Sequence, residues 1–382
     1  MDMPNNNPPI IDQRSLNAKR RLVRAKRGSV AKKVMVAMSG GVDSSVAALL
    51  LKNEGYEVTG VTMCLGVEMS GEKRCCGLDA VDDARRVCDR LHLPHYVFDY
   101  TQEMEEQVIG KFVAEYSRGR TPNPCIDCNR FLKFGSLLQK ATALGFDYLA
   151  TGHYATITWE KERFLLKKPR DKVKDQTYFL YAMPYEALSR ILFPLADLTK
   201  AEVRGMALKA GLPVAEKAES QDLCFVNRDS YPDFVARRMD TVCPGPIVDQ
   251  SGQQLGTHRG IVYYTIGQRS GLGIAHRAPL YVVAIDAPGN RLIVGEKSAL
   301  KATGLVAGDL NVLTDSWPAE VEAKIRYRRK PAKCTLAWDG DKIKVSFQEA
   351  EEAITPGQAV VFYQGDCVLG GGVIEEVLYG TC

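Results

Sequence analysis

The residues between 34 and 53 constrain the fold of this chain more than any others. The apolar run Val34 to Met38 has the length and composition of a buried strand, and Ser44 to Asn53 is a predicted helix that Gly55 ends. A second apolar run, Val58 to Met63, follows directly. Strand, helix and strand in this order predict a β-α-β unit, in which the two strands lie parallel in one sheet.

The same alternation extends the predicted sheet to about residue 151. Helices are expected at 79–91, 104–116 and 130–144, and strands at 96–99 and 148–151. Such a chain folds into a parallel sheet with helices on both faces, and its ligands bind at the carboxyl ends of the strands. We then expect a hairpin at 155–167 and helical stretches at 175–182, 185–192 and 200–210. From Cys243 onward, Gly, Pro and β-branched residues predict mostly β-structure.

The composition is that of an ordinary globular protein with one unusual end. Hydrophobic residues make up 45% and charged residues 25% of the 382 residues, and at about 150 residues per domain this length predicts two or three domains. The net charge of +4 is uneven, because residues 1–33 carry nine basic and two acidic side chains and the other 349 carry 41 − 44 = −3. Residues 1–32 are interpreted as a basic, disordered extension. A transit peptide is the alternative, and Asp2 and Asp12 count against it.

The apolar runs and the cysteines predict where the protein resides. No run approaches the ~18 consecutive apolar residues of a membrane span, and the N-terminus lacks the apolar stretch of a secretory signal. Since the eleven cysteines are an odd number without an export signal, we expect reduced thiols used in packing or chemistry. We therefore expect a cytoplasmic protein without a membrane partner.

The loop between the first strand and its helix, Ser39-Gly40-Gly41-Val42-Asp43-Ser44-Ser45, predicts a pyrophosphate site. Its glycines let the backbone approach a phosphate, and loop amides, serine hydroxyls and the positive end of the helix dipole favour an anion. The loop lacks the Gly-Lys-Ser/Thr of a Walker motif and the third spaced glycine of a dinucleotide fingerprint. The alternative is an ordinary strand-to-helix turn with a serine cap that binds no ligand.

This segment resembles the PP-loop ATP pyrophosphatases, which adenylate a carbonyl-type oxygen and release pyrophosphate. The resemblance implies ATP, with Mg²⁺, as the cofactor. It also implies that Met63, in the second strand, lies against the adenine, whereas a core methionine is the alternative from the residue alone. The ATP-binding residues implied so far are Ala37, Met38, Ser39, Gly40, Gly41, Val42, Asp43, Ser44 and Met63.

Two cysteine segments are distinctive. In Thr121-Pro122-Asn123-Pro124-Cys125-Ile126-Asp127-Cys128-Asn129, two prolines stiffen a loop, and Cys128 is expected to open a helix. A thiol at a helix N-terminus meets the positive end of the dipole, so a lowered pKa and a reactive thiolate are predicted. The second segment is Ser220-Gln221-Asp222-Leu223-Cys224-Phe225-Val226. For most of the other cysteines, including Cys64, packing is the default interpretation.

Together with Thr151-Gly152-His153-Tyr154, Lys174 to Leu180, Thr265 to Arg269, Ile325-Arg326-Tyr327 and Pro356-Gly357-Gln358, these segments resemble the tRNA-specific 2-thiouridylase family. The resemblance covers nearly the whole chain from Lys33. It implies a Rossmann-like PP-loop α/β domain at 33–226, a central domain at 227–297 and a tRNA-contacting C-terminal β-barrel at 298–382. The implied reaction replaces the C2 oxygen of the tRNA wobble uridine by sulfur, in the Lys, Glu and Gln acceptors. The sulfur comes from a cysteine desulfurase or a sulfur-relay protein.

The same resemblance implies individual roles. Cys128 is the nucleophile, Cys224 carries the persulfide, and Gly152 adjoins ATP. Asn123, Pro124 and Cys125 are placed at the target base. The residues implied for tRNA binding are His153, Lys174, Asp175, Gln176, Arg326, Tyr327 and Gln358. From the residues alone, a hydrogen-bonded histidine, a helix start and a solvated charge run are the alternatives.

Cys125 departs from the commonest pattern of the family, which has Asp there. The change creates Cys125-x-x-Cys128, and with Cys224 these thiolates could hold a 4Fe–4S cluster with one open iron. A persulfide mechanism and a cluster mechanism therefore both stay open, and structural zinc is less favoured because it needs a fourth ligand. The rival functions are a PP-loop amidating synthetase and a non-catalytic RNA-binding protein.

Overall fold

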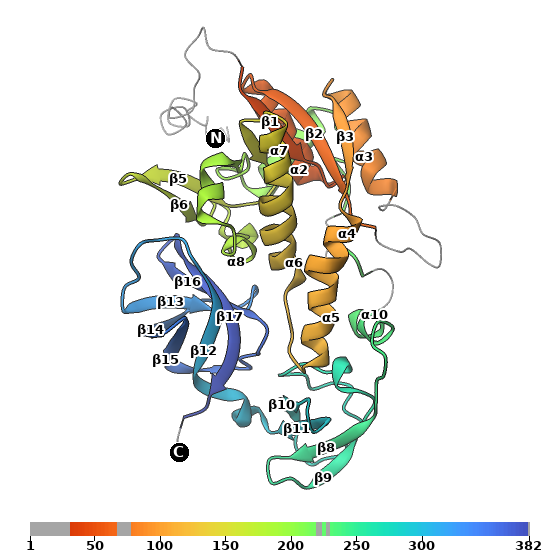
Figure 1. The fold of residues 1–382 in the computed structure, drawn as a ribbon, viewed down its shortest axis with the longest axis vertical. Helices are drawn as coiled ribbons and strands as arrows, with labels where there is room; N and C mark the ends of the chain where they lie inside the picture. The colour runs from red at the N-terminus through yellow and green to blue at the C-terminus, as the bar shows by residue number, and fades with distance from the viewer. Residues whose placement is uncertain (1–30, 67–77, 219–223, 227–229, 381–382) are drawn as a thin grey trace, which may run out of the picture.

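The computed structural model describes residues 31–66, 78–218, 224–226 and 230–380. Figure 1 shows the parallel sheet with its helices at the top, the β-barrel at the lower left, and a small β-rich unit at the lower right, below the long helices that run down from the sheet. The predicted fold class, an α/β domain followed by a central domain and a C-terminal barrel, is confirmed.

The first sheet is parallel and has five strands in the order β3-β2-β1-β4-β7. Its strands are β1 (Lys33–Ala37), β2 (Glu57–Cys64), β3 (His95–Asp99), β4 (Tyr148–Ala150) and β7 (Ile191–Leu192). The helices around it are α2 (Val42–Asn53), α3 (Leu78–Arg90), α4 (Thr101–Met104), η2 (Glu105–Ile109), α5 (Gly110–Ser117), α6 (Pro124–Asp127), η3 (Cys128–Leu137), α7 (Leu138–Ala143), η4 (Lys172–Lys174), α8 (Thr177–Leu180), η5 (Tyr185–Arg190) and α9 (Lys200–Lys209). The strand order reverses between β1 and β4, and ligands of open α/β sheets bind at such a point.

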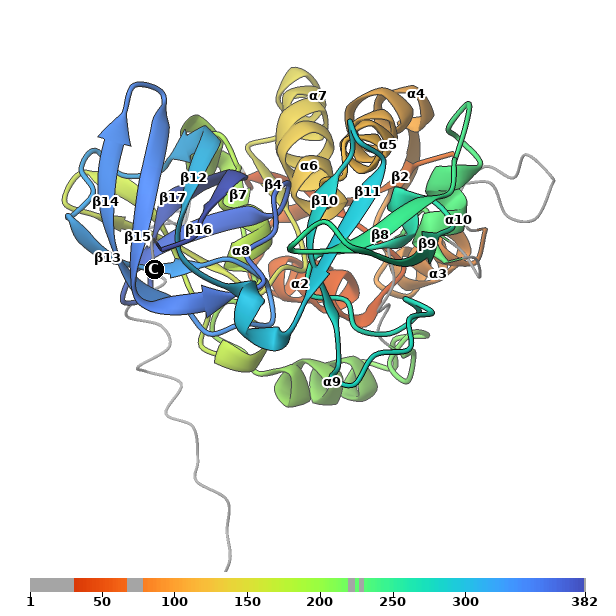
Figure 2. The same ribbon diagram turned by 90° about the horizontal axis from the view of Figure 1, so that it is seen from below.

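The central unit has a four-stranded sheet in the order β10-β11-β8-β9. Its elements are α10 (Tyr231–Ala236), β8 (Gly245–Asp249), β9 (Gln254–His258), η6 (Ile261–Tyr263), β10 (Tyr281–Asp286), β11 (Arg291–Gly295) and η7 (Lys297–Leu300). It has a separate small core of fully buried side chains such as Ile247, Val282, Leu292 and Val294. The unit lies below α5 in Figure 1, and Figure 2 shows it from below.

The C-terminal unit is an antiparallel barrel that the pairing of its first and last strands closes. Its strands are β12 (Lys301–Val312), β13 (Glu320–Lys324), β14 (Ala332–Asp339), β15 (Lys342–Glu352), β16 (Ala359–Gln364) and β17 (Cys367–Leu378). The predicted hairpin forms as β5 (Thr156–Glu160) and β6 (Arg163–Lys167), and Lys167 pairs with Cys367 of β17. The hairpin thus joins the barrel sheet to the first domain, although it belongs to the first domain in sequence.

Three helix predictions differ from the structure. The stretch expected at 175–182 is only the short helix Thr177–Leu180, and the Asp175 carboxylate accepts the Thr177 amide just before it. The stretch at 185–192 is a 3₁₀ turn followed by β7, whose residues pair with β4 as the edge strand of the sheet. The helix expected to open near Cys128 begins at Pro124, since the Asn123 side chain accepts the Cys125 amide and caps it there.

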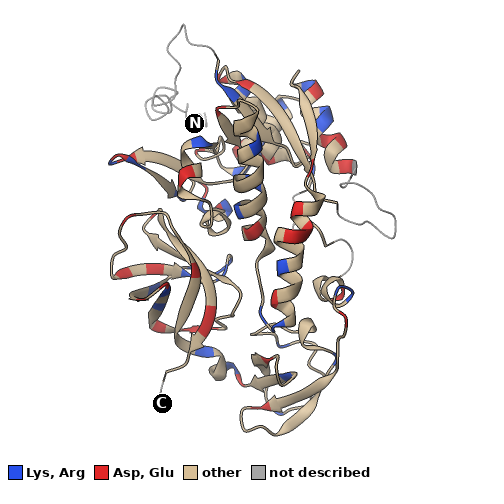
Figure 3. Ribbon diagram, in the orientation of Figure 1, with Lys and Arg blue, Asp and Glu red and all other residues tan. Residues whose placement is uncertain are grey.

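Two further observations concern the chain as a whole. Within the described residues, no helix has the length and apolar character needed to cross a membrane. Figure 3 shows basic and acidic residues interspersed over the ribbon, in keeping with the nearly balanced charge beyond residue 33. Cys64 is buried, as the packing interpretation predicts, but it is disulfide-bonded, so the prediction of a reduced thiol is wrong at this position.

Candidate active site

The predicted pyrophosphate loop joins β1 to α2 at the carboxyl edge of the sheet. Gly40 has φ +67°, and a Cβ there would lie 2.4 Å from the Ala80 carbonyl oxygen, so only glycine fits. The Ser44 hydroxyl accepts the Ser39 amide at 3.2 Å and lies 3.2 Å from the Gly41 carbonyl oxygen, to which it donates. These bonds hold the loop in a curl with the helix N-terminus behind it, the geometry that favours an anion.

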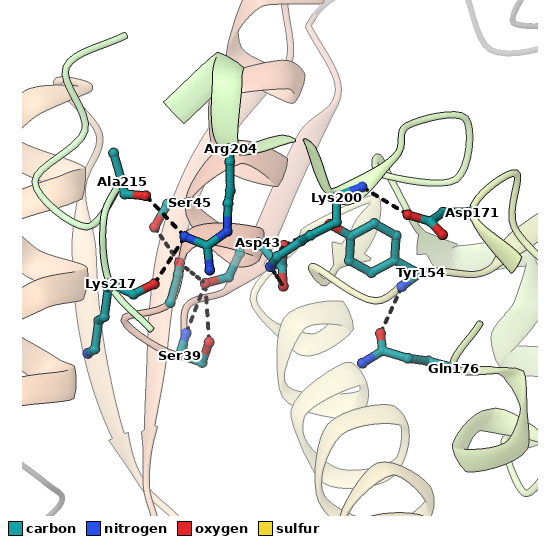
Figure 4. Close-up of polar contacts among 12 residues, drawn as sticks. Ser39, Asp43, Ser45, Tyr154, Asp171, Gln176, Lys200, Arg204, Ala215 and Lys217 are labelled. Atoms are coloured by element: carbon teal, nitrogen blue, oxygen red, sulfur yellow. Dashed lines mark hydrogen bonds and ion pairs between the residues drawn. The ribbon is translucent and has the colours of Figure 1, made fainter. Parts of the chain in front are cut away.

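The carboxylate of Asp43 anchors a second group of residues at this loop (Figure 4). The Lys200 ammonium lies 2.7 and 2.8 Å from its two oxygens, and the Tyr154 hydroxyl donates to one of them at 2.9 Å. Lys200 is the first residue of α9, which a Thr199–Glu202 capping box starts. Asp43 therefore binds α9 to the loop, a role that the sequence did not reveal.

A second lysine reaches the loop from the other side. The Lys217 ammonium donates to the Gly40 carbonyl at 3.1 Å and pairs with Asp83. Arg204 donates to the Lys217 carbonyl at 3.3 Å and so holds this segment against α9 (Figure 4). Two ammonium groups thus flank a loop built for a phosphate. Sequence reasoning missed both lysines; the capping box could have placed Lys200 at a helix start, but no local signal marks Lys217.

The remaining residues implied for ATP lie at the same edge of the sheet. Gly152 comes just after β4 in the sequence and packs against the first turn of α2. A Cβ at this position would lie 2.5 Å from the Ser44 amide nitrogen. Met63 is partly buried near the end of β2 and packs against the larger core. Met38 is buried in the other core, so it can offer a ligand its backbone but not its side chain. The structure therefore brings the implied residues together, with Met38 in a structural role.

The predicted cysteine loop is held from the barrel side. The Gln358 amide donates to the Thr121 carbonyl at 2.9 Å, and the Thr121 amide donates to the Pro356 carbonyl at 2.9 Å. Gly357 has φ +90°, and a Cβ there would lie 2.8 Å from the Thr121 nitrogen. Gln358, which the resemblance implied for tRNA binding, here fixes the loop that carries Asn123, Pro124 and Cys125.

The environment of Cys128 corrects a prediction. Because the helix begins at Pro124, Cys128 lies one turn inside it and is 7% exposed. Burial raises the pKa of the Cys128 thiol above its usual value, the Lys133 ammonium opposes this shift, and the Asp127 carboxylate adds to it. The expected lowering by the helix dipole is therefore wrong, since that effect is confined to the first turn.

The structure brings three thiols together. Desolvation raises the pKa of Cys224 to about 12, and the nearby thiols of Cys128 and Cys125 add to the shift. Cys224 itself is exposed, while its neighbour Phe225 is buried edge-on against Phe112 at 5.4 Å. The segment that carries Cys224 is thus anchored to the core through Phe225.

These thiols do not form a metal site as they are arranged. Among the described residues, no three His, Cys, Asp or Glu side chains are placed to hold a metal ion. The ligand set proposed for a cluster, Cys125, Cys128 and Cys224, consequently does not fit one in this arrangement.

Comparisons with known proteins match all three structural units of the chain. Three domain families match in succession: the tRNA methyl transferase HUP domain at 32–228, the tRNA methyl transferase PRC-barrel domain at 232–296 and the aminomethyltransferase beta-barrel domain at 302–374. The tRNA-specific 2-thiouridylase 1 of Syntrophus aciditrophicus is 62% identical, over 91% of this chain and 94% of its own length. That of Moorella thermoacetica is 53% identical, over 90% and 99%.

The chain belongs to the tRNA-specific 2-thiouridylase family. The resemblance drawn from the motifs is thereby confirmed. The family also directs attention to the surface on which an RNA would lie.

Several residues implied for tRNA binding are engaged within the protein. The Arg326 guanidinium donates to the carbonyls of Ile266 and Ala353 at 3.1 and 3.0 Å, and so joins the barrel to the central unit. Gln176 accepts the Tyr154 amide at 2.9 Å. The tRNA-contacting role expected for Arg326 stays a prediction; in this arrangement one of its guanidinium nitrogens is bonded within the protein.

His153 and Tyr327 pack into aromatic clusters. The His153 ring lies 6.0 Å from Phe134 and accepts or donates a hydrogen bond with Thr151 at 2.7 Å. Burial, with a smaller effect of Lys133, lowers the pKa of His153 well below its usual value, so the ring is neutral. Tyr327 stacks at 4.4 Å on Phe179. Lys174 lies in η4, beside the cavity described next.

A basic cavity of about 630 Å³ lies between the segment around η4 and the barrel. Its cationic lining residues are Lys168, Lys172, Lys324, Arg328, Arg329 and Lys330. Lys324 is 9% exposed; its ammonium has no hydrogen bond or ion pair among the described residues, although the Asp175 carboxylate, which also lines the cavity, acts on it electrostatically. The ammonium lies 5.3 Å from the ring centre of Tyr327, and desolvation lowers its pKa. A buried cation in this state calls for an anionic ligand. Sequence reasoning missed Lys324.

Gly152→Ala should impair ATP binding without unfolding the protein, because its Cβ would displace the Ser44 amide from the loop. We expect at least tenfold weaker binding, on the order of 1.4 kcal/mol, in calorimetric titration with a non-hydrolysable ATP analogue. The matched control is Gly205→Ala in α9, where a Cβ meets nothing within 4 Å. This control should bind normally and gain about 0.5–1 kcal/mol of helix stability. Equal binding by both variants would contradict the assignment.

Proposed function

We propose that the chain is an ATP-dependent tRNA-uridine 2-sulfurtransferase that converts the wobble uridine to 2-thiouridine. One observation supports this most directly, namely that the nucleotide loop and the helix that carries Cys128 are joined through two consecutive residues, Gly152 and His153. Gly152 touches the loop at Ser44, the next residue, His153, packs on Phe134, and Phe134 belongs to the helix that carries Cys128. An adenylated base held at the loop would therefore lie near the sulfur donor.

The chemistry needs both parts of the site. ATP adenylates the C2 oxygen, which is otherwise a poor leaving group, and pyrophosphate departs. The terminal sulfur of a Cys224 persulfide then forms a bond to C2, and AMP leaves with the oxygen. The Cys128 thiolate attacks Cys224 Sγ, the sulfur–sulfur bond breaks, and its electron pair stays on the sulfur of the base. A thiol reductant reopens the resulting Cys128–Cys224 disulfide.

The same site suggests how ATP is bound and how sulfur is supplied. We propose that Lys200 and Lys217 face the triphosphate when ATP is present, since both ammonium groups flank the loop. Mg²⁺ arrives as the counterion of ATP. We assign it no protein ligand, because the Asp43 carboxylate is engaged by Lys200. The exposed position of Cys224 suits reloading by a cysteine desulfurase or a sulfur-relay protein.

We propose that tRNA lies over the basic cavity, which supports an RNA substrate through local charge although residues 34–382 carry a net −3. The wobble uridine of the Lys, Glu and Gln acceptors is the proposed target. The basic extension 1–32 then adds salt-sensitive affinity. An amidating PP-loop synthetase would need no thiol cluster, and a non-catalytic RNA-binding protein would need no nucleotide loop.

The reaction is tested with purified protein, unmodified tRNA, Mg–ATP, a persulfide donor and a thiol reductant. Nucleoside mass spectrometry should find 2-thiouridine with the wild-type protein and none with Cys224→Ser or Cys128→Ser. Cys367→Ser is a control, because this thiol lies on β17 in the barrel, away from the cluster. Formation of 2-thiouridine by the Cys224→Ser protein, or none by the wild type, would overturn the proposal.

Cys125 separates the two sulfur-transfer mechanisms. A persulfide mechanism predicts that Cys125→Asp, which restores the commoner family residue, keeps at least about a tenth of the activity, a loss no larger than 1.4 kcal/mol in the barrier. A cluster mechanism predicts complete loss, because a thiolate ligand is removed. The measurement is 2-thiouridine formation by protein purified without oxygen, together with its iron and sulfide content. Stoichiometric iron that Cys125→Asp abolishes along with activity would establish the cluster instead.

Lys324→Gln should weaken tRNA binding and lower its salt dependence, since one phosphate contact is lost. The slope of log K against log salt should fall by about 0.7–0.9, measured by filter binding across a salt series. The control Lys344→Gln removes an equal charge from an exposed position of β15. If both variants change the slope equally, the cavity is not the RNA site.

A further inference from the structure

We propose that Asp171 is a positioning residue that couples ATP binding at the nucleotide loop to RNA binding at the basic cavity. The inference rests on the proposed function, because it takes ATP to occupy the loop and tRNA to lie over the cavity. It concerns a residue that lies outside every motif by which the chain resembles its family.

The carboxylate of Asp171 joins two segments that are 29 residues apart in the sequence. Its Oδ1 accepts the amides of Val173 and Lys174 at 3.1 and 3.3 Å, and so caps η4. Its Oδ2 accepts the amide of Lys200 at 2.9 Å, as Figure 4 shows. This amide belongs to the first residue of α9, where a helix has no internal acceptor for it. One rigid group therefore sets the position of η4 relative to the start of α9.

Lys200 carries this constraint to the nucleotide loop. Its backbone amide is held by Asp171, while its ammonium lies 2.7 and 2.8 Å from the Asp43 oxygens. The Lys200 side chain is only 13% exposed, so its course from α9 to the loop is confined by its surroundings. A triphosphate at the loop adds a further anion for the same ammonium. Bound ATP therefore favours the arrangement in which Lys200 and the start of α9 are fixed.

η4 carries the constraint to the RNA side. Lys172 and Val173 of this turn line the basic cavity, and the Lys172 ammonium pairs with Asp366, another lining residue, at 2.7 Å. Val173 is 88% exposed, and its amide is one of the two that Asp171 accepts. The carboxylate thus fixes the backbone that presents this part of the cavity wall to an RNA.

A second connection runs beside the first. The Tyr154 hydroxyl donates to Asp43 at 2.9 Å, and the Tyr154 amide donates to the Gln176 side-chain oxygen at 2.9 Å. The Gln176 amide in turn donates to the Tyr154 carbonyl at 3.1 Å. Both connections begin at the Asp43 carboxylate and end within residues 171–176, on the two sides of Lys200 and Tyr154 that Figure 4 shows. The nucleotide loop and the cavity wall are therefore tied by hydrogen bonds throughout.

The coupling is positive, because both ligands favour one arrangement of Asp171. ATP fixes the start of α9, RNA fixes η4, and the same carboxylate holds both. By thermodynamic linkage, the factor by which ATP tightens tRNA binding equals the factor by which tRNA tightens ATP binding. The protein then holds ATP most firmly when its RNA substrate is present, which limits the use of ATP without tRNA.

The test is the affinity of the full-length protein for unmodified tRNA, measured by filter binding with and without a saturating non-hydrolysable ATP analogue. The analogue should tighten tRNA binding by the wild type about tenfold. Asp171→Asn keeps the size of the side chain and an oxygen that can cap η4, but its amide group cannot accept the Lys200 amide. The ratio should fall to about threefold or less, since only the connection through Tyr154 remains.

The matched control is Asp197→Asn, which removes an equal charge from an exposed position three residues before Lys200. It should keep the wild-type ratio. Because the ratio compares one protein with itself, a general loss of affinity cancels and a merely structural role leaves it unchanged.

Three results would overturn the proposal: a wild-type ratio of one, an Asp171→Asn ratio equal to that of the wild type, or an equal fall in Asp197→Asn. If Asp171→Asn fails to fold, Asp171→Ser gives the same measurement, because its hydroxyl can cap a turn but is too short to join both segments. The proposed function fails separately, through 2-thiouridine formation by the Cys224→Ser protein or none by the wild type.

Discussion

The contact between the ends of β1 and β4 is the constraint on which the rest of the site depends. At this point the sheet order reverses, and Gly152 approaches the first turn of α2 so closely that no side chain fits. The contact fixes the nucleotide loop on one side. On the other side it fixes His153 and, through Phe134, the helix that carries Cys128. Nucleotide chemistry and sulfur chemistry therefore share one rigid junction, as catalysis through positioning requires.

The barrel also contributes contacts that position the residues of the site. Gln358 and Pro356 bond to Thr121, so a barrel turn determines where the cysteine loop begins. Arg326 joins the barrel to the central unit through backbone carbonyls. Residues that look like RNA contacts in the sequence are thus partly the joints between domains. The cationic side chains that we propose for RNA binding line the cavity around Lys324 instead.

Burial and charge oppose each other throughout the site. Thiols, a histidine and a lysine are each desolvated, and each has its pKa moved toward the neutral form. Local cations and ligands must restore the charged forms that the chemistry needs. For Lys324, we propose that the anion which restores the charged form is an RNA phosphate.

The sequence by itself determined the parallel sheet, the pyrophosphate loop, the paired cysteine segments and the β-rich last third. These features depend on the spacing of apolar residues and on the positions of glycine and proline. Such patterns are local, so they can be recognised in the sequence without knowledge of the tertiary structure. Only the tertiary structure decided that Cys128 is buried, that Arg326 bonds to backbone carbonyls, and that Lys200 and Lys217 lie at the nucleotide loop. The physical reason is that the pKa and the partners of a charged group depend on desolvation and on residues distant in sequence, which no local pattern encodes.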